Sequence, residues 1–242
     1  MRLHKNLCFA VIDGLNSIFN DEEYADKVIQ KLLKRDKRWG SRDRAFVAET
    51  TYDIVRWKRL YAEIANVKAP YDRDNLWRLF AVWATLKGIK LPDWKYFVGT
   101  PTRKIKGRFD ELSKFRVFRE SVPDWIDAIG VKELGENVWT KELAVQNKQA
   151  DVVLRVNTLK TNKSQLIHDL QDEHIEAEAI NGYPDALKLI ERANVFKTEV
   201  FKKGAFEVQD ASSQLVAGFL DVKPGMKVVD TCAGAGGKTL HI

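Results

Sequence analysis

The sequence predicts a multidomain protein: an all-α helical bundle, then a small α+β module, then the start of a doubly wound, Rossmann-like α/β domain. Three observations support this order. Apolar residues recur at helical spacing over the first 90 residues, short apolar runs alternate with an amphipathic segment over residues 151–191, and a glycine-rich loop follows the apolar run 226–230. The length of 242 residues and an apolar share of 45% suit two or three packed units.

Four amphipathic helices are predicted in the first 90 residues. Asp21 is the expected N-cap of the second helix, and Ser41, which follows Gly40, starts the third. The apolar faces of the four helices consist of Val11, Leu15 and Ile18; Ala25, Val28, Ile29, Leu32 and Leu33; Phe46, Thr50, Ile54 and Trp57; and Leu76, Leu79, Phe80, Trp83 and Leu86. Short connections between such helices predict a bundle.

The helical pattern loosens between residues 91 and 122. Breaker signals stand at Leu91-Pro92-Asp93 and at Thr100-Pro101-Thr102. Ser121-Val122-Pro123-Asp124-Trp125 then opens another helical stretch, which runs toward Gln149. We therefore expect the helical part of the chain to end near residue 150.

The pattern changes from Asp151 onward. Residues 152–157 read as a buried strand, 164–173 as a helix, and 175–180 and 186–191 as two further strands. This order predicts a small α+β module. A helix from Asp210 to Leu220 follows, with Asp210 as its cap, and Met226–Asp230 is predicted to be one more strand.

Positive charge is concentrated in the first part of the chain. Residues 1–150 hold 29 Lys and Arg against 21 Asp and Glu, a surplus of +8, whereas residues 151–242 hold 11 against 13, a deficit of −2. A one-sided basic surplus favours a polyanionic partner such as nucleic acid, although many basic proteins bind none.

The composition also bounds the class of protein. Cys8 and Cys232 are the only cysteines in the sequence, and no apolar run approaches the roughly 20 residues of a membrane span. The N-terminus has no signal-peptide pattern. We expect a cytoplasmic, monomeric protein with reduced thiols, no membrane association and no metal site.

The glycine-rich segment after residue 230 carries the functional information. A phosphate-binding P-loop would need its first glycine where Cys232 stands, although Gly237-Lys238-Thr239 fits the end of that motif. A dinucleotide fingerprint that starts at Gly234 would need a glycine in place of Thr239. Both patterns therefore fail at an essential position.

A third pattern fits the loop better. An acidic residue, Asp230, ends the predicted strand, and small residues then occupy every second position, at Cys232, Gly234 and Gly236. Missing side chains let a turn pass close beneath a ligand at the carboxyl end of a strand. This arrangement is typical of S-adenosylmethionine sites, because a sulfonium cofactor needs backbone amides and a carboxylate. The alternative is a glycine-rich turn without a ligand.

Several stretches together resemble one family. These are Val208-Gln209-Asp210-Ala211-Ser212-Ser213, Val222-Lys223-Pro224-Gly225, the loop from Val229 to Thr239, Leu154-Arg155-Val156-Asn157-Thr158-Leu159-Lys160 and Ser121-Val122-Pro123-Asp124-Trp125. The chain is similar to the Sun family of S-adenosylmethionine-dependent RNA cytosine-5 methyltransferases, whose loop reads D-x-C-A-A-P-G-G-K-T. The family's Ala-Pro is Gly234-Ala235 here, which raises the flexibility of the loop but removes no ligand-binding group.

The resemblance implies a domain order. Residues 1–120 would form a NusB-like helical RNA-binding domain, because Arg42-Asp43-Arg44-Ala45-Phe46 and Tyr52-Asp53-Ile54-Val55-Arg56 resemble that bundle. Residues 121–205 would form a helical linker and a small, RRM-like pre-catalytic module, and residues 206–242 the beginning of the methyltransferase domain. The implied cofactor-binding residues are Asp230, Cys232, Ala233, Gly234, Ala235, Gly236, Gly237 and Lys238.

The resemblance also implies the chemistry. In the family a cysteine thiolate adds to C6 of the target cytosine, C5 then takes the methyl group, and a second cysteine assists product release. Those cysteines belong to later motifs, so we expect no catalytic residue in these 242 residues and no activity from them alone. Cys232 is assigned to the cofactor loop rather than to catalysis, and Cys8 to the core.

RNA, and ribosomal RNA in particular, is the partner that the resemblance implies. The candidate contacts lie in two basic clusters and in the signature strand: Arg35, Arg38, Arg42 and Arg44; Arg103, Lys104 and Lys106; and Arg155, Asn157 and Lys160. A charge run is more often a solvated face, and Lys238 has the same two alternatives.

Two other functions stay open on the sequence alone. A non-catalytic RNA-binding or assembly factor of NusB-like type would explain the basic helical part without a methyltransferase domain. A methyltransferase for proteins or small molecules would explain the loop but not the signature from Arg155 to Lys160. The sequence does not specify which RNA or which cytosine is modified.

Overall fold

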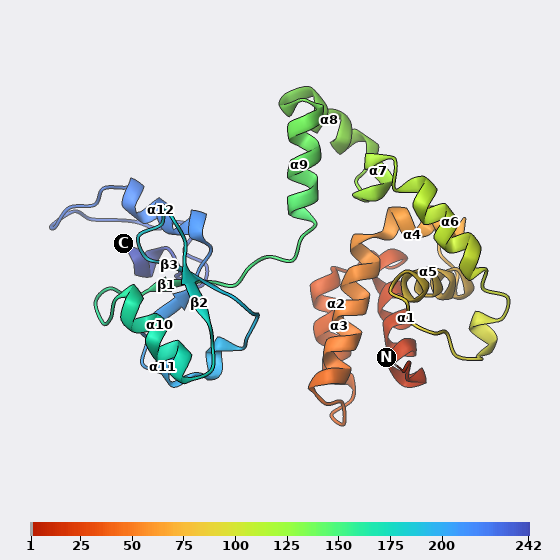
Figure 1. Cartoon of the computed structure of the whole chain (residues 1–242), viewed down its shortest axis with the longest axis horizontal. Helices are drawn as coiled ribbons and strands as arrows, with labels where there is room; N and C mark the ends of the chain where they lie inside the picture. Colours follow the sequence, from red (N-terminus) through yellow and green to blue (C-terminus); the bar gives the residue numbers. More distant parts are fainter. Residues whose placement is uncertain (1) are drawn as a thin grey trace. The chain divides into compact units, whose positions relative to one another are not determined.

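The computed structural model describes residues 2–242, which divide into two compact units, 1–148 and 149–242 (Figure 1). The first unit consists of helices, and the second contains a four-stranded sheet. This confirms the prediction of a helical part followed by a small α+β module. Residues 121–148 belong to the helical unit, although the sequence predicted that they belong with the module.

The first unit is built from nine α-helices and a short 3-10 helix among the residues that the structure describes. Its elements are α1 (Lys5–Phe19), α2 (Ala25–Arg35), α3 (Ser41–Arg56), α4 (Lys58–Ala65), α5 (Arg73–Leu86), η1 (Lys95–Phe97), α6 (Thr102–Leu112), α7 (Arg116–Arg119), α8 (Asp124–Leu134) and α9 (Glu136–Gln146).

The core of this unit forms around α5, which is buried on nearly all sides. Trp77 and Phe80 are almost completely inaccessible and pack edge to face, with ring centroids 5.8 Å apart. The apolar faces predicted for α1 and α2 contribute Leu15, Val28 and Leu32 to the same cluster. The amphipathic patterns therefore identified the buried faces correctly.

One local prediction in this unit is wrong, and the structure adds detail to three others. Asp21 does not cap α2, because Tyr24 holds the N-cap position and no side chain caps the helix. The third predicted helix is α3, and a further helix, α4, follows directly after Trp57. Thr100-Pro101-Thr102 interrupts the helical pattern as predicted, and α6 begins at Thr102. The predicted helical stretch toward Gln149 consists of two helices, α8 and α9, which Gly135 separates with a φ of 76°.

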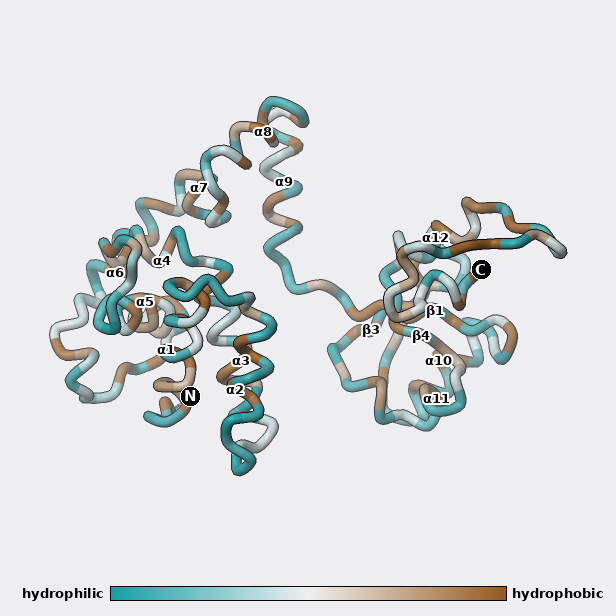
Figure 2. Tube along the Cα trace, turned by 180° about the vertical axis from the view of Figure 1, so that it is seen from behind, coloured by the Kyte–Doolittle hydropathy of each residue, from teal (hydrophilic) through white to brown (hydrophobic). Residues whose placement is uncertain are grey.

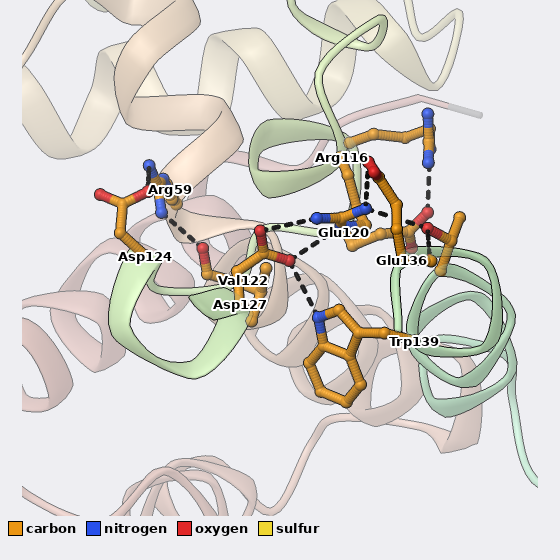
Figure 3. Close-up of polar contacts among 10 residues, drawn as sticks. Arg59, Arg116, Glu120, Val122, Asp124, Asp127, Glu136 and Trp139 are labelled. Carbon is orange, nitrogen blue, oxygen red and sulfur yellow. Dashed lines mark hydrogen bonds and ion pairs between the residues drawn. The ribbon is translucent and has the colours of Figure 1, made fainter. Parts of the chain in front are cut away.

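Residues 121–148 join the helical unit through polar contacts (Figure 3). Arg59 of α4 donates to the Val122 carbonyl oxygen at 2.5 Å and to the Asp124 carboxylate at 2.7 Å. Arg116 of α7 makes a bidentate pair with Asp127 of α8, at 2.8 and 2.9 Å. These bonds connect α7 and α8 to the preceding bundle.

The helix pair α8 and α9 has its own small core. Trp139 packs there with Val122 and Leu143, and its indole N–H donates to Asp127 at 2.9 Å. Gly130 faces the Trp139 ring so closely that an added Cβ would lie 2.2 Å from ring carbons. The absence of a side chain at Gly130 therefore sets how closely the two helices approach.

The second unit is an antiparallel sheet with the strand order β2-β3-β1-β4. Its strands are β1 (Val153–Val156), β2 (Ala177–Ala179), β3 (Ala186–Leu189) and β4 (Phe206–Val208), and its helices are α10 (Lys163–Asp172), η2 (Val195–Lys197), α11 (Glu199–Lys202), α12 (Ala211–Phe219) and η3 (Thr239–His241). Leu154, Leu166, Leu170, Leu187 and Phe206 are fully buried in its core. The strands and helix predicted over residues 152–191 are confirmed within a few residues.

The chain beyond α12 leaves the sheet as a loop and returns beside α12 (Figure 1), and part of this loop is hydrophobic (Figure 2). Residues 226–230, predicted to be a strand, form no strand. A strand needs ladder hydrogen bonds to a neighbour, and none of the four strands pairs with this segment. Its apolar side chains are consequently exposed, Val229 at 83%.

Within the described residues, no helix combines the length and the apolarity that crossing a lipid bilayer requires.

Candidate functional site

The loop 230–239 is closed by its own acidic residue. One carboxylate oxygen of Asp230 accepts a hydrogen bond from the Cys232 amide at 3.0 Å, and the other accepts from the Thr239 hydroxyl at 2.7 Å. These bonds, with the Thr239 bond as the larger cause, hold the pKa of the Asp230 carboxyl below its ordinary value. Asp230 is therefore charged at neutral pH and ties together the two ends of the loop.

The glycines of the loop have backbone conformations that other residues rarely adopt. Gly234 has a φ of 55° and Gly236 a φ of 84°. The Gly236 amide donates to the Ala233 carbonyl oxygen at 2.8 Å, whereas no partner within residues 2–242 accepts from the amides of Gly234, Ala235 and Gly237. Exposed, uncommitted amides in a turn without bulky side chains suit a ligand that carries carboxylate and hydroxyl groups.

Arg155 of β1 anchors the far end of the loop. Its guanidinium donates to the Gly237 carbonyl oxygen at 2.9 Å and to the Gln209 side-chain oxygen at 3.1 Å. The residue is only 6% exposed. Burial lowers the pKa of Arg155, and the nearby carboxylates of Glu207 and Asp185 act in the opposite direction. The sequence predicts an RNA contact for Arg155. In the structure, however, the Arg155 side chain is buried and holds the loop.

Two glutamines that were not among the predicted site residues complete this anchor. The Gln209 amide group also donates to the Gly237 carbonyl oxygen, at 3.3 Å. Gln214 of α12 donates to the Gln209 backbone carbonyl oxygen at 3.0 Å. Both glutamines are buried. The sequence signal that could have found them is Gln209 itself, which stands in the stretch that carries the family resemblance.

The other two residues of the signature strand also bond within the unit. Asn157 donates to the Gly204 carbonyl oxygen at 2.8 Å, and Lys160 donates to the Lys203 carbonyl oxygen at 2.6 Å. They stabilise the turn that leads into β4. The signature Arg155 to Lys160 therefore supports two loops of its own unit.

The basic residues of the first unit differ in how they are engaged. Arg35 pairs with Asp13 at 2.7 Å, and Arg38 makes a bidentate pair with Asp36. The remaining predicted RNA contacts are exposed and form no ion pair with any residue that the structure describes; they are Arg42, Arg44, Arg103, Lys104 and Lys106. Among the predicted contacts of this unit, these five side chains are therefore the ones without a competing carboxylate in the described part of the chain.

Comparisons with known proteins agree with this combination of units. A family model for the "Methyltr_RsmF/B-like, ferredoxin-like domain" matches residues 122–196. "Probable ribosomal RNA small subunit methyltransferase B" of Synechocystis is 34% identical over 276 aligned positions, which cover 98% of this chain and 60% of that protein. "Ribosomal RNA small subunit methyltransferase B" of Yersinia enterocolitica is 36% identical over 157 positions, which cover 64% of this chain and 36% of the relative.

The fold has a solved counterpart. The crystal structure of PH0851 superposes with a TM-score of 0.65 at 22% identity, over 100% of this chain and 61% of that one. At this level of identity the likeness shows the fold alone. The chain resembles the Sun family in its motifs, and the matching family model and the curated relatives support this assignment. It spans between about a third and three-fifths of the length of the two curated relatives named above.

Proposed function

We propose that this chain is the RNA-docking and cofactor-loop portion of an S-adenosylmethionine-dependent RNA cytosine-5 methyltransferase that acts on small-subunit ribosomal RNA. The main support for this proposal is the geometry of the loop 230–239, which Asp230 closes at one end and Arg155 anchors at the other. The names of the curated relatives support the reaction and the substrate class.

The loop residues fit the cofactor in kind. The amides of Gly234, Ala235 and Gly237 are oriented by a turn whose glycines leave the backbone uncovered, and they would hold the amino-acid tail or ribose. Arg155 and Gln209 would keep the carbonyl end of the loop in place. When bound, the cofactor supplies the methyl group. The exposed apolar segment 226–229 is what a neighbouring strand of a Rossmann-like sheet would cover.

Neither cysteine of this chain suits the role of the attacking thiolate. Cys8 is fully buried in the helical core, and burial raises the pKa of its thiol to about 12. Cys232 lies in the loop assigned to the cofactor. The proposed reaction therefore takes its nucleophile from a sequence motif outside these 242 residues.

Methyl transfer tests the proposal directly. The product of the full reading frame and the 242-residue chain are incubated with labelled S-adenosylmethionine and small-subunit ribosomal RNA, and both are tested for RNA binding. Label on C5 of cytosine with the longer protein only, and RNA binding by both, is the expected result. RNA binding without transfer by either protein would favour the second candidate, a non-catalytic assembly factor, which the basic helical unit also suits.

A further inference from the structure

The helical unit contains a pocket of about 750 Å³, which has no role in the proposed function. Its wall combines the end of α4, one face of α5, the segment 95–101 and the start of α6, which Figure 1 shows around α5. The size is in the range of small-molecule sites, whose volumes run from about 300 to 1,000 Å³. All lining residues belong to the unit 1–148, so the pocket is complete within it.

The lining carries an excess of positive charge. Arg78, Lys95, Lys104 and Arg108 line the pocket, against one carboxylate, Asp74. Arg108 is engaged by Glu63, at 3.5 Å between charged groups, and by the Glu63 carbonyl oxygen at 2.7 Å. The other three cations make no ion pair with a residue in the described range 2–242. Three uncommitted cations around one cavity favour an anionic ligand.

The pocket also has an aromatic wall. Tyr96 stacks on Trp77 with ring centroids 4.4 Å apart and planes at 12°. Trp77 is 1% exposed, whereas Tyr96 is partly exposed, so Tyr96 offers the accessible aromatic surface. Lys95 lies 5.2 Å from the Tyr96 ring centre. A cation beside an accessible aromatic ring suits a ligand that joins a phosphate to a flat base.

Two lining residues carry buried donors that lack partners. Trp77 Nε1 and Arg108 Nε make no hydrogen bond to any described residue. Buried unpaired donors are rare in folded proteins and mark places that water or a ligand completes. This observation is independent of the charge count and also points to a ligand rich in acceptors.

We propose that this pocket receives an unpaired nucleotide of the RNA substrate, with its phosphate at Arg78, Lys95 and Lys104 and its base beside Tyr96. A longer strand is favoured over a free nucleotide because Arg103 and Lys106 extend the positive charge along α6 beyond the pocket. A duplex does not fit, since its bases are stacked and paired and cannot enter a side pocket. The proposal rests on the proposed function for its substrate class.

Two substitutions on the same helix provide the test. Lys104 and Lys106 are both exposed residues of α6, but only Lys104 lines the pocket. Binding of a short labelled single-stranded RNA to the 242-residue chain is measured by fluorescence anisotropy for wild type, Lys104→Glu and Lys106→Glu. We expect Lys104→Glu to weaken binding by about tenfold or more and Lys106→Glu by about threefold or less, because only the first reverses a pocket charge.

Equal losses of RNA affinity in the two variants would contradict the proposed nucleotide pocket, because they would indicate binding to a diffuse basic surface. So would the absence of single-strand binding by the wild type, a duplex of the same sequence that binds as tightly, or a nucleoside monophosphate that binds as tightly as the strand. Tyr96→Leu gives a second measurement, with an expected loss of about fivefold or more from lost stacking and circular dichroism to verify folding. Methyl transfer is not measured, so failure here leaves the proposed reaction intact, and failure of methyl transfer leaves this result intact.

Discussion

Arg155 connects the antiparallel module to the glycine-rich loop through a single nitrogen. That nitrogen lies 2.9 Å from the Gly237 carbonyl oxygen and 3.1 Å from Gln209, at a nearly inaccessible position. If such a buried acceptor loses its donor, it stays removed from water without a hydrogen bond. This costs about 1–3 kcal/mol of stability. The geometry therefore makes Arg155 a positioning residue for the loop.

Arg155→Ala is expected to free residues 236–239 and to lower the stability of the second unit by about 1–3 kcal/mol. Hydrogen exchange of the loop amides, compared with those of β3, separates the two effects. Arg155→Lys keeps the charge but loses the planar geometry, so an intermediate loss of protection is expected. Unchanged exchange in the loop of Arg155→Ala would show that Gly237 is held by other groups.

The two cysteines are predicted to differ strongly in reactivity. Cys8 is fully buried with a pKa raised to about 12, so about one molecule in ten thousand carries its thiolate at pH 8. Cys232 is exposed. A disulfide reagent should therefore modify one thiol rapidly, and the second only when the protein unfolds.

Cys232→Ser is the control for this titration, because it should remove the fast phase and leave the slow one unchanged. Two fast thiols in the wild type would mean that α1 opens easily, contrary to its position in the main core.

At the scale of elements, the contact between α8 and α9 depends on one missing side chain. A Cβ at Gly130 would lie 2.2 Å from the Trp139 ring, so Gly130→Ala forces the helices apart or rotates the indole away from Asp127. Such overpacking costs about 1–3 kcal/mol. Urea unfolding should show this loss.

Gly107→Ala is the matched control, because Gly107 lies inside α6 with nothing within 4 Å of an added Cβ. Alanine there should raise stability by about 0.5–1 kcal/mol through helix propensity alone. If both substitutions shift stability in the same direction, propensity rather than the Trp139 contact governs the α8 and α9 pair.

The elements that sequence patterns predict best are those whose signal is local. The large apolar residues of α5 recur at helical spacing, and β1 is a short continuous run of buried residues, so each element is visible in one stretch of sequence. The break between α3 and α4 at Trp57 and the break between α8 and α9 at Gly135 depend on backbone angles at single residues. The failed strand 226–230 has the right side chains, but a strand also needs a neighbour.

For the whole molecule, the sequence motifs predict the position of the glycine-rich loop but not its anchor. The loop is contiguous, so its glycine spacing is visible in one stretch of chain, from Asp230 to Thr239. Gln209 and Arg155 reach it from 28 and 82 positions away. The pocket beside Tyr96 likewise assembles from four separate segments. Contacts of this kind are not encoded in any local pattern.

The two units have separate cores, since the clusters around Trp77 and Trp139 lie before residue 148 and the cluster around Phe206 lies after it. The segment between the end of α9 at Gln146 and the start of β1 at Val153 contains the exposed Lys148. Limited trypsin digestion should therefore cut early after Lys148, and Lys148→Gln should remove that cut, as mass spectrometry of the fragments would show.

The fragments also test where RNA affinity resides. Residues 1–148 carry the whole +8 surplus, and residues 149–242 carry −2. Salt weakens RNA binding in proportion to the number of phosphates neutralised, with a slope of about −0.7 per contact for single strands. We expect fragment 1–148 to keep the affinity and the salt slope of the parent chain within about a factor of three. If affinity and slope instead follow fragment 149–242, the cations of the helical unit are a solvated surface, and recognition of RNA begins at the antiparallel module.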